Sequence, residues 1–147
     1  MTHLIDTNVW HKASRFSGIA DALRSLDDDG AVFSTCPAII AEYCFSARSA
    51  RELEMMQADL AQFYLLDKSE LGDRVRTIQR WLWRHGRARA AGAADTLIAA
   101  YAVAHKQTIV TCDKGFLHIS TALKRGRKAE RLHVLHLAET GTITEIY

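Results

Sequence analysis

The chain has 147 residues, with 19 Lys and Arg against 17 Asp and Glu, a formal net charge of +2, and 48% hydrophobic residues. This length and composition are typical of one globular domain with its own core, and the small net charge excludes a protein that binds polyanions over its whole surface. Three scattered cysteines exclude a disulfide framework and a C-x-x-C zinc site, and the lack of a long apolar segment or signal-peptide pattern predicts a cytoplasmic location with no membrane insertion.

The first half of the chain alternates short apolar segments with segments of helical pattern. The expected strands of this half cover residues 3–5, 31–34 and 64–66. The expected helices are one through Ile19 and Leu23, one that begins at Pro37, and one over residues 50–63. Proline suits the first turn of a helix, because the first turn needs no backbone donor.

The second half continues the same alternation. Its expected helices cover residues 71–85, 93–105 and 116–123, and its expected strands cover residues 108–111 and 133–136. Residues 93–105 have the clearest helical pattern, because their apolar side chains recur on one stripe. The alternation predicts an α/β layer fold with a mostly parallel sheet. Without a linker or an internal repeat, residues 1–147 are expected to form a single domain.

Four acidic residues are the strongest candidates for a functional site. Asp6 and Asp113 follow predicted strands, and the carboxyl ends of parallel strands meet at the edge where α/β proteins bind ligands. Asp95 lies in the first turn of a predicted helix near that edge, and Glu42 lies within the helix after the second strand. Taken singly, each acid has a structural explanation as a turn, a cap, a partner of a helix dipole or an exposed helix residue. Their joint placement favours a function.

Carboxylates that converge on one crevice repel one another, and burial raises the cost of their charge. A divalent cation removes this conflict, and oxygen ligands suit Mg²⁺ or Mn²⁺. Such an ion activates water and stabilises the leaving oxygen of a phosphodiester. Thr7, Asn8 and Thr111 lie beside the acids in sequence and are suited to orient them by hydrogen bonds. The acids therefore predict a metal-dependent nuclease.

Four segments of the chain resemble the acidic segments of the PIN domain family, and specifically of its small bacterial VapC toxins. They are LIDTNV at residues 4–9, PAIIAE at residues 37–42, AADTLIAAYA at residues 93–102, and TIVTCDKGF at residues 108–116. Their order and intervals agree with the family, and the resemblance covers nearly the whole chain.

The resemblance implies a three-layer α/β/α sandwich and Mg²⁺- or Mn²⁺-dependent endoribonuclease activity on RNA. It also implies a homodimer and neutralisation by a cognate VapB-like antitoxin. Carried over by position, Asp6, Glu42, Asp95 and Asp113 would bind the metal, and Thr111 would assist catalysis. The chain departs from many relatives at Gly115, where they carry a further aspartate, so a fifth acidic ligand is not expected.

Two basic segments are candidates for contact with RNA phosphates. Arg76, Arg80, Arg84 and Arg87 are spaced to share one helix face, next to Trp81 and Trp83. A second cluster surrounds Gly126 and consists of Lys124, Arg125, Arg127 and Lys128. A solvated face or an interface with an acidic partner explains the same pattern equally well, and at least one tryptophan is expected to be buried.

Other enzyme and signalling classes fit less well. A haloacid-dehalogenase-type phosphatase needs a second aspartate at the position of Asn8, and a response-regulator receiver needs an acidic pair after the first strand. Two alternatives keep the PIN fold. One is an RNA-processing nuclease outside any toxin system, and the other is a partner-binding protein without catalysis, against which the four acids argue.

Overall fold

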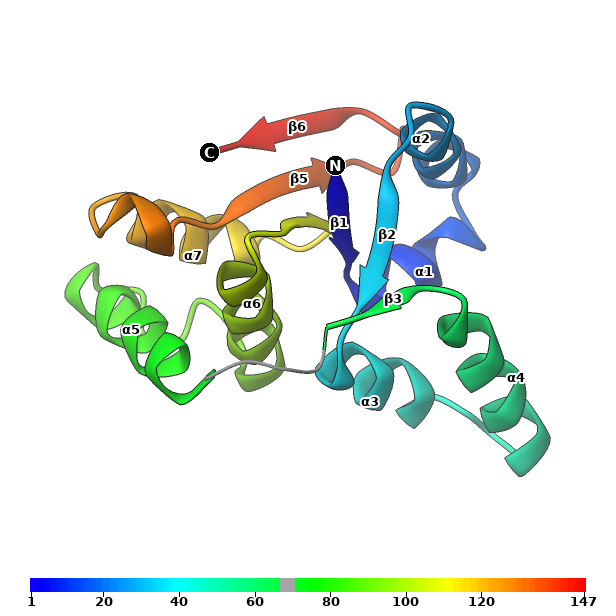
Figure 1. The fold of residues 1–147 in the computed structure, drawn as a ribbon. Coiled ribbons are helices and arrows are strands. Elements are labelled where there is room, and N and C mark those ends of the chain that lie inside the picture. The colour runs from blue at the N-terminus through cyan, green and yellow to red at the C-terminus, as the bar shows by residue number, and fades with distance from the viewer. Residues whose placement is uncertain (67–70) are drawn as a thin grey trace.

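A six-stranded sheet forms the centre of the computed structural model, which describes residues 1–66 and 71–147 (Figure 1). In chain order the strands are β1 (Thr2–Ile5), β2 (Val32–Thr35), β3 (Tyr64–Leu65), β4 (Thr108–Thr111), β5 (His133–Leu137) and β6 (Ile143–Ile146). Their order across the sheet is β3-β2-β1-β4-β5-β6. The first five strands are parallel, and β6 pairs antiparallel with β5. The predicted mostly parallel sheet is confirmed.

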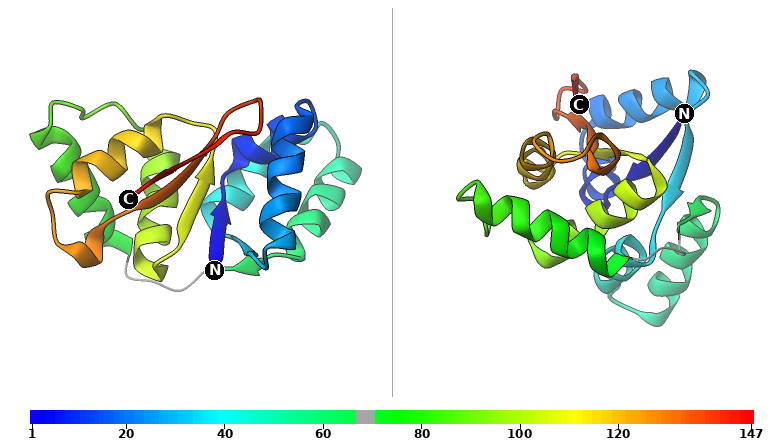
Figure 2. Two further views of the ribbon diagram at one scale, coloured as in Figure 1. Left: turned by 90° about the horizontal axis from the view of Figure 1, so that it is seen from above. Right: turned by 60° about the vertical axis from the view of Figure 1, so that its left-hand side comes forward.

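Helices cover both faces of this sheet, which confirms the predicted α/β/α sandwich (Figure 2). They are α1 (Thr7–Ala13), α2 (Ser17–Asp28), α3 (Pro37–Phe45), α4 (Ala50–Ala61), α5 (Leu71–Arg84), α6 (Ala93–His105) and α7 (Gly115–Leu123), with a 3-10 turn at Lys128–Glu130. Within the described ranges, none of these helices combines the length and the apolar character that crossing a membrane requires.

The alternation of side chains along each strand divides the core into two layers. Leu4, Ile109 and Val134 point to the face that α3, α5, α6 and α7 cover. The next residues along the same strands, Ile5, Val110 and Leu135, point to the opposite face, where they pack against α1 and α2. All strand residues named here are less than 10% exposed, so the sheet is buried on both faces as a parallel sheet requires.

Two elements were not predicted from the sequence. Helix α1 begins directly after β1, and its Asp-Thr-Asn start has the composition of a turn; in the structure Asp6 is the N-cap and accepts a hydrogen bond from the Thr7 amide. Strand β6 lies at the sheet edge with three of its four residues exposed, so it lacks the apolar alternation that marks a half-buried strand.

The strand order places a switch point between β1 and β4. From β1 the chain adds β2 and β3 on one side, and β4 and β5 then extend the sheet on the other side. The Asp6 amide donates to the Val110 carbonyl at 3.0 Å, which joins the ends of the two central strands. In open α/β sheets, ligands bind beyond the carboxyl ends of the strands at such a switch point.

Candidate active site

Asp6 and Asp113 meet at the switch point through the hydroxyl group of Thr111. Asp6 follows β1 and is 3% exposed, and its Oδ2 atom accepts a hydrogen bond from Thr111 Oγ1 at 2.8 Å. The same Oγ1 atom accepts the Asp113 amide at 2.9 Å. Asn8 fixes the turn between them, because its Oδ1 atom accepts the Cys112 amide at 3.0 Å. One buried hydroxyl group thus orients the first acid and the turn that carries the fourth.

Glu42 and Asp95 reach the same edge from helices α3 and α6. Glu42 is exposed on α3, and its carboxylate accepts a hydrogen bond from Thr7 Oγ1 at 2.9 Å, next to Asp6 in the chain. Asp95 lies in the first turn of α6, where its Oδ2 atom accepts the Gly92 amide at 3.3 Å. We call Asp6, Glu42, Asp95 and Asp113 together the acidic edge.

Gly115 is the point where the carboxylates of Asp95 and Asp113 come closest to the backbone of α7. A Cβ atom at this position would lie 3.3 Å from Asp95 Oδ2 and 3.4 Å from Asp113 Oδ1. The Gly115 amide donates to Asp113 Oδ1 at 2.8 Å. A side chain here would therefore crowd both acids, so the glycine provides the space in which they face each other. In the sequence, its position at the start of a helix two residues after Asp113 is the signal of this role.

The carboxylates of the acidic edge perturb one another electrostatically. Burial, together with the charges of Asp95 and Glu42, raises the pKa of Asp6 to about 7, although hydrogen bonds from Thr111 and the Thr7 amide oppose the shift. Burial also raises the pKa of Asp95, and the charges of Asp113 and Glu42 add to that rise. These mutual effects place the four acids within electrostatic reach of one another.

The chemistry of these donors fits a hard divalent cation. Carboxylates and hydroxyl groups are the ligands that Mg²⁺ and Mn²⁺ prefer, and a cation would offset the cost of the buried Asp6 charge. Burial raises the pKa of the nearby Cys36 thiol to about 11, and a thiol suits softer metals than Mg²⁺. Within residues 1–66 and 71–147, no three His, Cys, Asp or Glu side chains are arranged as a preformed metal site.

Three of the arginines predicted to contact RNA, Arg76, Arg80 and Arg84, lie at four-residue intervals on one face of α5, and Arg87 does not. Arg80 and Arg84 line a groove beside α5. Arg76 lies one turn nearer the start of α5, where it forms an ion pair with Asp73. The placement of Arg87 on the same helix face was wrong: α5 ends at Arg84, and Gly86, with a φ of 65°, turns the chain so that Arg87 lies beside His118 of α7 at 3.4 Å.

The two tryptophans beside these arginines differ in exposure. Trp83 is 72% exposed, whereas Trp81 is partly buried and packs against the core. The expectation that at least one of them is buried is met in part, by Trp81.

Several solved structures share this fold. VapBC2 from Rickettsia felis, bound to a DNA fragment from its promoter, superposes with a TM-score of 0.67 at 17% identity over 91% of this chain and 98% of that chain. VapBC-1 from nontypeable Haemophilus influenzae gives a TM-score of 0.66 at 19% identity over 82% and 94% of the two chains. FitAcB from Neisseria gonorrhoeae gives a TM-score of 0.60 at 21% identity over 80% and 92%. At these identities the similarity shows the fold.

The family follows from the sequence match. No curated protein sequence matches the chain. The model of the PIN domain family matches residues 3–122, a range that includes all four acids and Thr111. The resemblance predicted from the four acidic segments is thereby confirmed: the chain belongs to the PIN domain family.

Proposed function

We propose that this protein is a Mg²⁺- or Mn²⁺-dependent endoribonuclease that hydrolyses RNA phosphodiesters at the acidic edge. PIN domains are typically metal-dependent nucleases. The observation that carries the proposal is the convergence of Asp6, Asp95 and Asp113 at the switch point, with Glu42 beside them. The high cost of ionising a buried carboxylate such as Asp6 is offset when a cation is bound.

Each residue of the acidic edge has a proposed role. Asp6, Asp95 and Asp113 would hold the cation, which when bound supplies Lewis-acid chemistry that activates water and stabilises the leaving oxygen. Glu42, whose exposed carboxylate accepts a hydrogen bond from Thr7, would hold a second cation or orient the attacking water. Thr111 would keep the Asp6 carboxylate and the Asp113 turn in fixed positions through its hydrogen bonds to both.

We further propose that the nuclease is the toxin of a VapBC-type pair, that it forms a homodimer, that it acts in the cytoplasm, and that a VapB-like antitoxin neutralises it. The VapBC and FitAcB complexes among the structures of similar fold support this proposal. An upstream gene for a small protein with a DNA-binding N-terminal segment is expected. An isolated gene, with no growth inhibition on expression, would favour an RNA-processing PIN nuclease outside a toxin system.

Cleavage of RNA in the presence and absence of divalent cation tests the activity. We expect cleavage with Mg²⁺ or Mn²⁺, none with excess EDTA, and recovery when the cation is restored. Asp6→Asn and Asp95→Asn should reduce cleavage to background while leaving the circular dichroism spectrum unchanged. In Asp95→Asn the new side chain keeps an oxygen that can accept the Gly92 amide, so the start of α6 remains capped. Unchanged cleavage by both variants would refute the metal assignment and favour a contaminating nuclease.

A further inference from the structure

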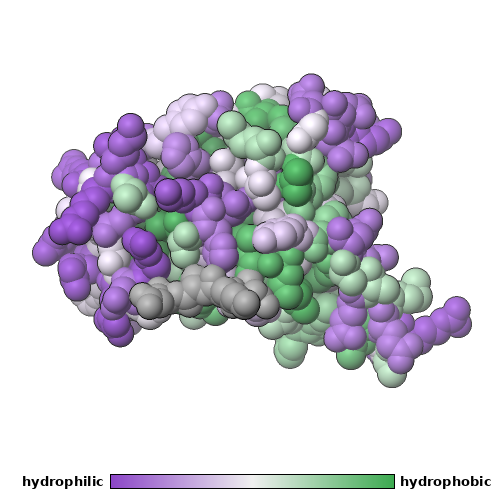
Figure 3. Space-filling model, in the orientation of Figure 1, coloured by the Kyte–Doolittle hydropathy of each residue, from purple (hydrophilic) through white to green (hydrophobic). Residues whose placement is uncertain are grey.

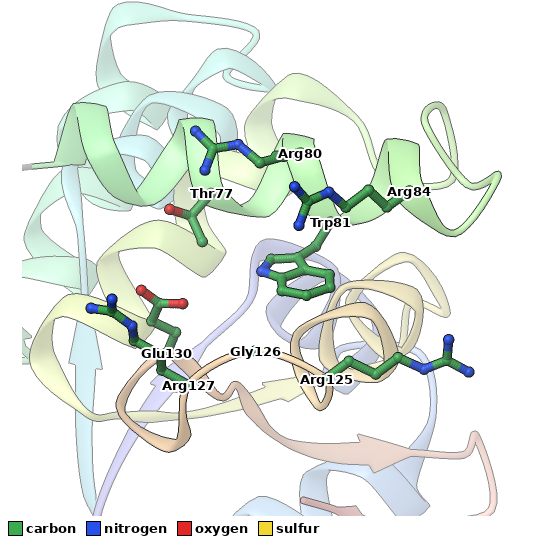
Figure 4. Close-up of a pocket in the computed structure, with 8 residues that line it drawn as sticks. All are labelled: Thr77, Arg80, Trp81, Arg84, Arg125, Gly126, Arg127 and Glu130. Atoms are coloured by element: carbon green, nitrogen blue, oxygen red, sulfur yellow. The ribbon is translucent and has the colours of Figure 1, made fainter.

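A groove between α5 and the segment after α7 gathers four arginines around one tryptophan. Arg80 and Arg84 come from α5, and Arg125 and Arg127 come from the segment that follows α7 (Figure 4). Trp81 points from α5 toward Gly126 and forms the floor, and Thr77 and Glu130 complete the lining. We call this site the basic groove. It joins two basic segments that are about forty residues apart in the chain, and hydrophilic side chains dominate this part of the surface (Figure 3).

The arginines of the basic groove are available to a ligand. All four are exposed, and within the described part of the chain none of their guanidinium groups forms an ion pair or a hydrogen bond. This contrasts with Arg24, Arg48 and Arg76, which each pair with a neighbouring acid. Four arginines and Glu130 give the groove a formal charge of +3, whereas the whole chain carries only +2. The positive charge that attracts a polyanion is therefore concentrated at the basic groove.

Packing around Trp81 makes the groove a fixed structure. The indole lies so close to Gly126 that a Cβ atom there would be 3.2 Å from Trp81 Nε1 and 3.3 Å from the Leu123 carbonyl oxygen. On the α5 side, the guanidinium of Arg84 lies over the indole ring, 5.1 Å from its centroid, in a cation–π contact. Trp81 thus contacts both sides of the groove, α5 and the segment after α7, and positions Arg84.

The basic groove and the acidic edge lie at opposite ends of the same helix. Helix α7 begins at Gly115, against Asp95 and Asp113, and ends at Leu123, just before Arg125. Nine residues of helix span ~13 Å, so a strand of a few nucleotides would reach from one site to the other. Arg80 and Arg84 are one turn apart on α5, about 6 Å along its axis, a separation close to that of neighbouring phosphates in a single strand.

We propose that the basic groove binds the phosphodiester backbone of the RNA strand whose cleavage occurs at the acidic edge. This inference rests on the proposed function. It names the residues that bind the RNA at phosphates other than the one that is cleaved. Arg80, Arg84, Arg125 and Arg127 each contact phosphate oxygens, and Trp81 positions Arg84. Arg76 and Arg87 are outside the groove and do not take part.

Salt dependence of RNA binding tests this assignment. The binding of an end-labelled single-stranded RNA oligonucleotide is followed by fluorescence anisotropy in EDTA, so that no cleavage occurs, over a series of salt concentrations. For R80Q/R125Q we expect weaker binding, with the slope of log K against log salt reduced by about 0.7 for each phosphate that the variant no longer neutralises. R80K/R125K keeps the charges and should restore most of the slope.

The matched control is R15Q/R24Q, which removes the same charge from exposed arginines near α2, on the other side of the sheet. It should keep the wild-type slope. An equal decrease of the slope in R15Q/R24Q would overturn the proposal, because the effect would then follow net charge alone. An unchanged slope in R80Q/R125Q would also overturn it; loss of polyglutamate binding in that variant would then assign the groove to an acidic protein segment.

Cleavage assays separate this inference from the proposed function. With a long RNA, R80Q/R125Q should raise KM and leave kcat nearly unchanged. With an RNA too short to reach from the acidic edge to the groove, its kcat/KM should equal that of the wild type. Wild-type protein that binds RNA but never cleaves it would refute the nuclease while leaving the groove assignment intact. Cleavage of long RNA by R80Q/R125Q with wild-type KM would refute the groove assignment alone.

Discussion

Asp6 at the acidic edge is 3% exposed and accepts hydrogen bonds from the Thr7 amide and from Thr111, whereas the arginines of the basic groove are exposed on helix and loop surfaces. At the acidic edge the ends of the strands bring negative charges close together. The free-energy cost of ionising Asp6 there appears as its raised pKa. The charged side chains of the groove are exposed to solvent, so the free-energy cost of their charge is small. In the proposed function, the first region holds reacting groups in fixed geometry, and the second attracts a chain of phosphates.

Thr111→Val should separate the two regions most clearly, because it should lower RNA cleavage without changing RNA binding. It removes the hydroxyl group that donates to Asp6 and accepts the Asp113 amide, so both acids lose their common support. Loss of such a supporting hydrogen bond typically lowers activity or metal affinity by roughly 10- to 100-fold. We expect this fall in RNA cleavage rate, with RNA binding in EDTA unchanged. Thr111→Ser retains the hydroxyl group and should cleave RNA at close to the wild-type rate.

Gly115→Ala should have a smaller effect on the same region. The added methyl group would lie 3.3 Å from Asp95 Oδ2 and 3.4 Å from Asp113 Oδ1, so the two carboxylates must move apart by a few tenths of an ångström. Since misplacement of catalytic groups by 1 Å can cost about 100-fold, we expect roughly a tenfold loss of cleavage. Gly72→Ala on α5, where among the described residues a Cβ atom contacts only the end of Arg76, is the matched control. Equal losses in both variants would mean that helix stability, not carboxylate position, is responsible.

The smallest predicted effect is a change of folding stability with pH that comes from Asp6. The pKa of Asp6 is about 7 in the folded protein, above the ordinary value of 3.8, so folding favours the protonated form. In EDTA, this destabilisation is absent below about pH 4, grows as pH rises, and is complete above about pH 7.

Asp6→Asn removes that destabilisation. The melting temperature of the variant relative to wild type should therefore rise between pH 4 and pH 8. The corresponding change in unfolding free energy is a few kcal/mol at most, since each pKa unit is worth about 1.4 kcal/mol. Mg²⁺ at pH 8 should raise the melting temperature of the wild type more than that of the variant. A melting difference that stays constant with pH would contradict the raised pKa of Asp6.

The sequence was most informative where one local pattern decides the structure. Helix α6 and strand β4 have the predicted bounds: α6 is a long apolar segment whose residues 98–103 are all buried, and β-branched residues mark the strand. Helix α1 was missed because only Thr7 and Val9 of its seven residues are buried, which leaves too weak a periodicity. Short-range patterns do not report how such a segment packs.

The acidic edge was easier to predict than the basic groove for a physical reason. Asp6 and Asp113 follow parallel strands, and the topology of a parallel sheet brings such positions together whatever the details of packing. The approach of Arg80 to Arg125 depends on how α5 packs on α7 and on the contact of Trp81 with Gly126, and no local pattern encodes either. The sequence alone therefore indicated two basic clusters and not one groove.

The antiparallel direction of β6 has a practical consequence. Ile146 pairs with Val134 near the start of β5, and the ring of Tyr147 lies 5.3 Å from that of His133, while Met1 precedes the start of β1. Both ends of the chain therefore lie at the edge of the sheet opposite the carboxyl ends of the parallel strands. A fluorescent protein or an immobilisation tag fused to either terminus would extend from the edge of the sheet opposite the acidic edge, so surface-tethered protein can be assayed with the acidic edge free.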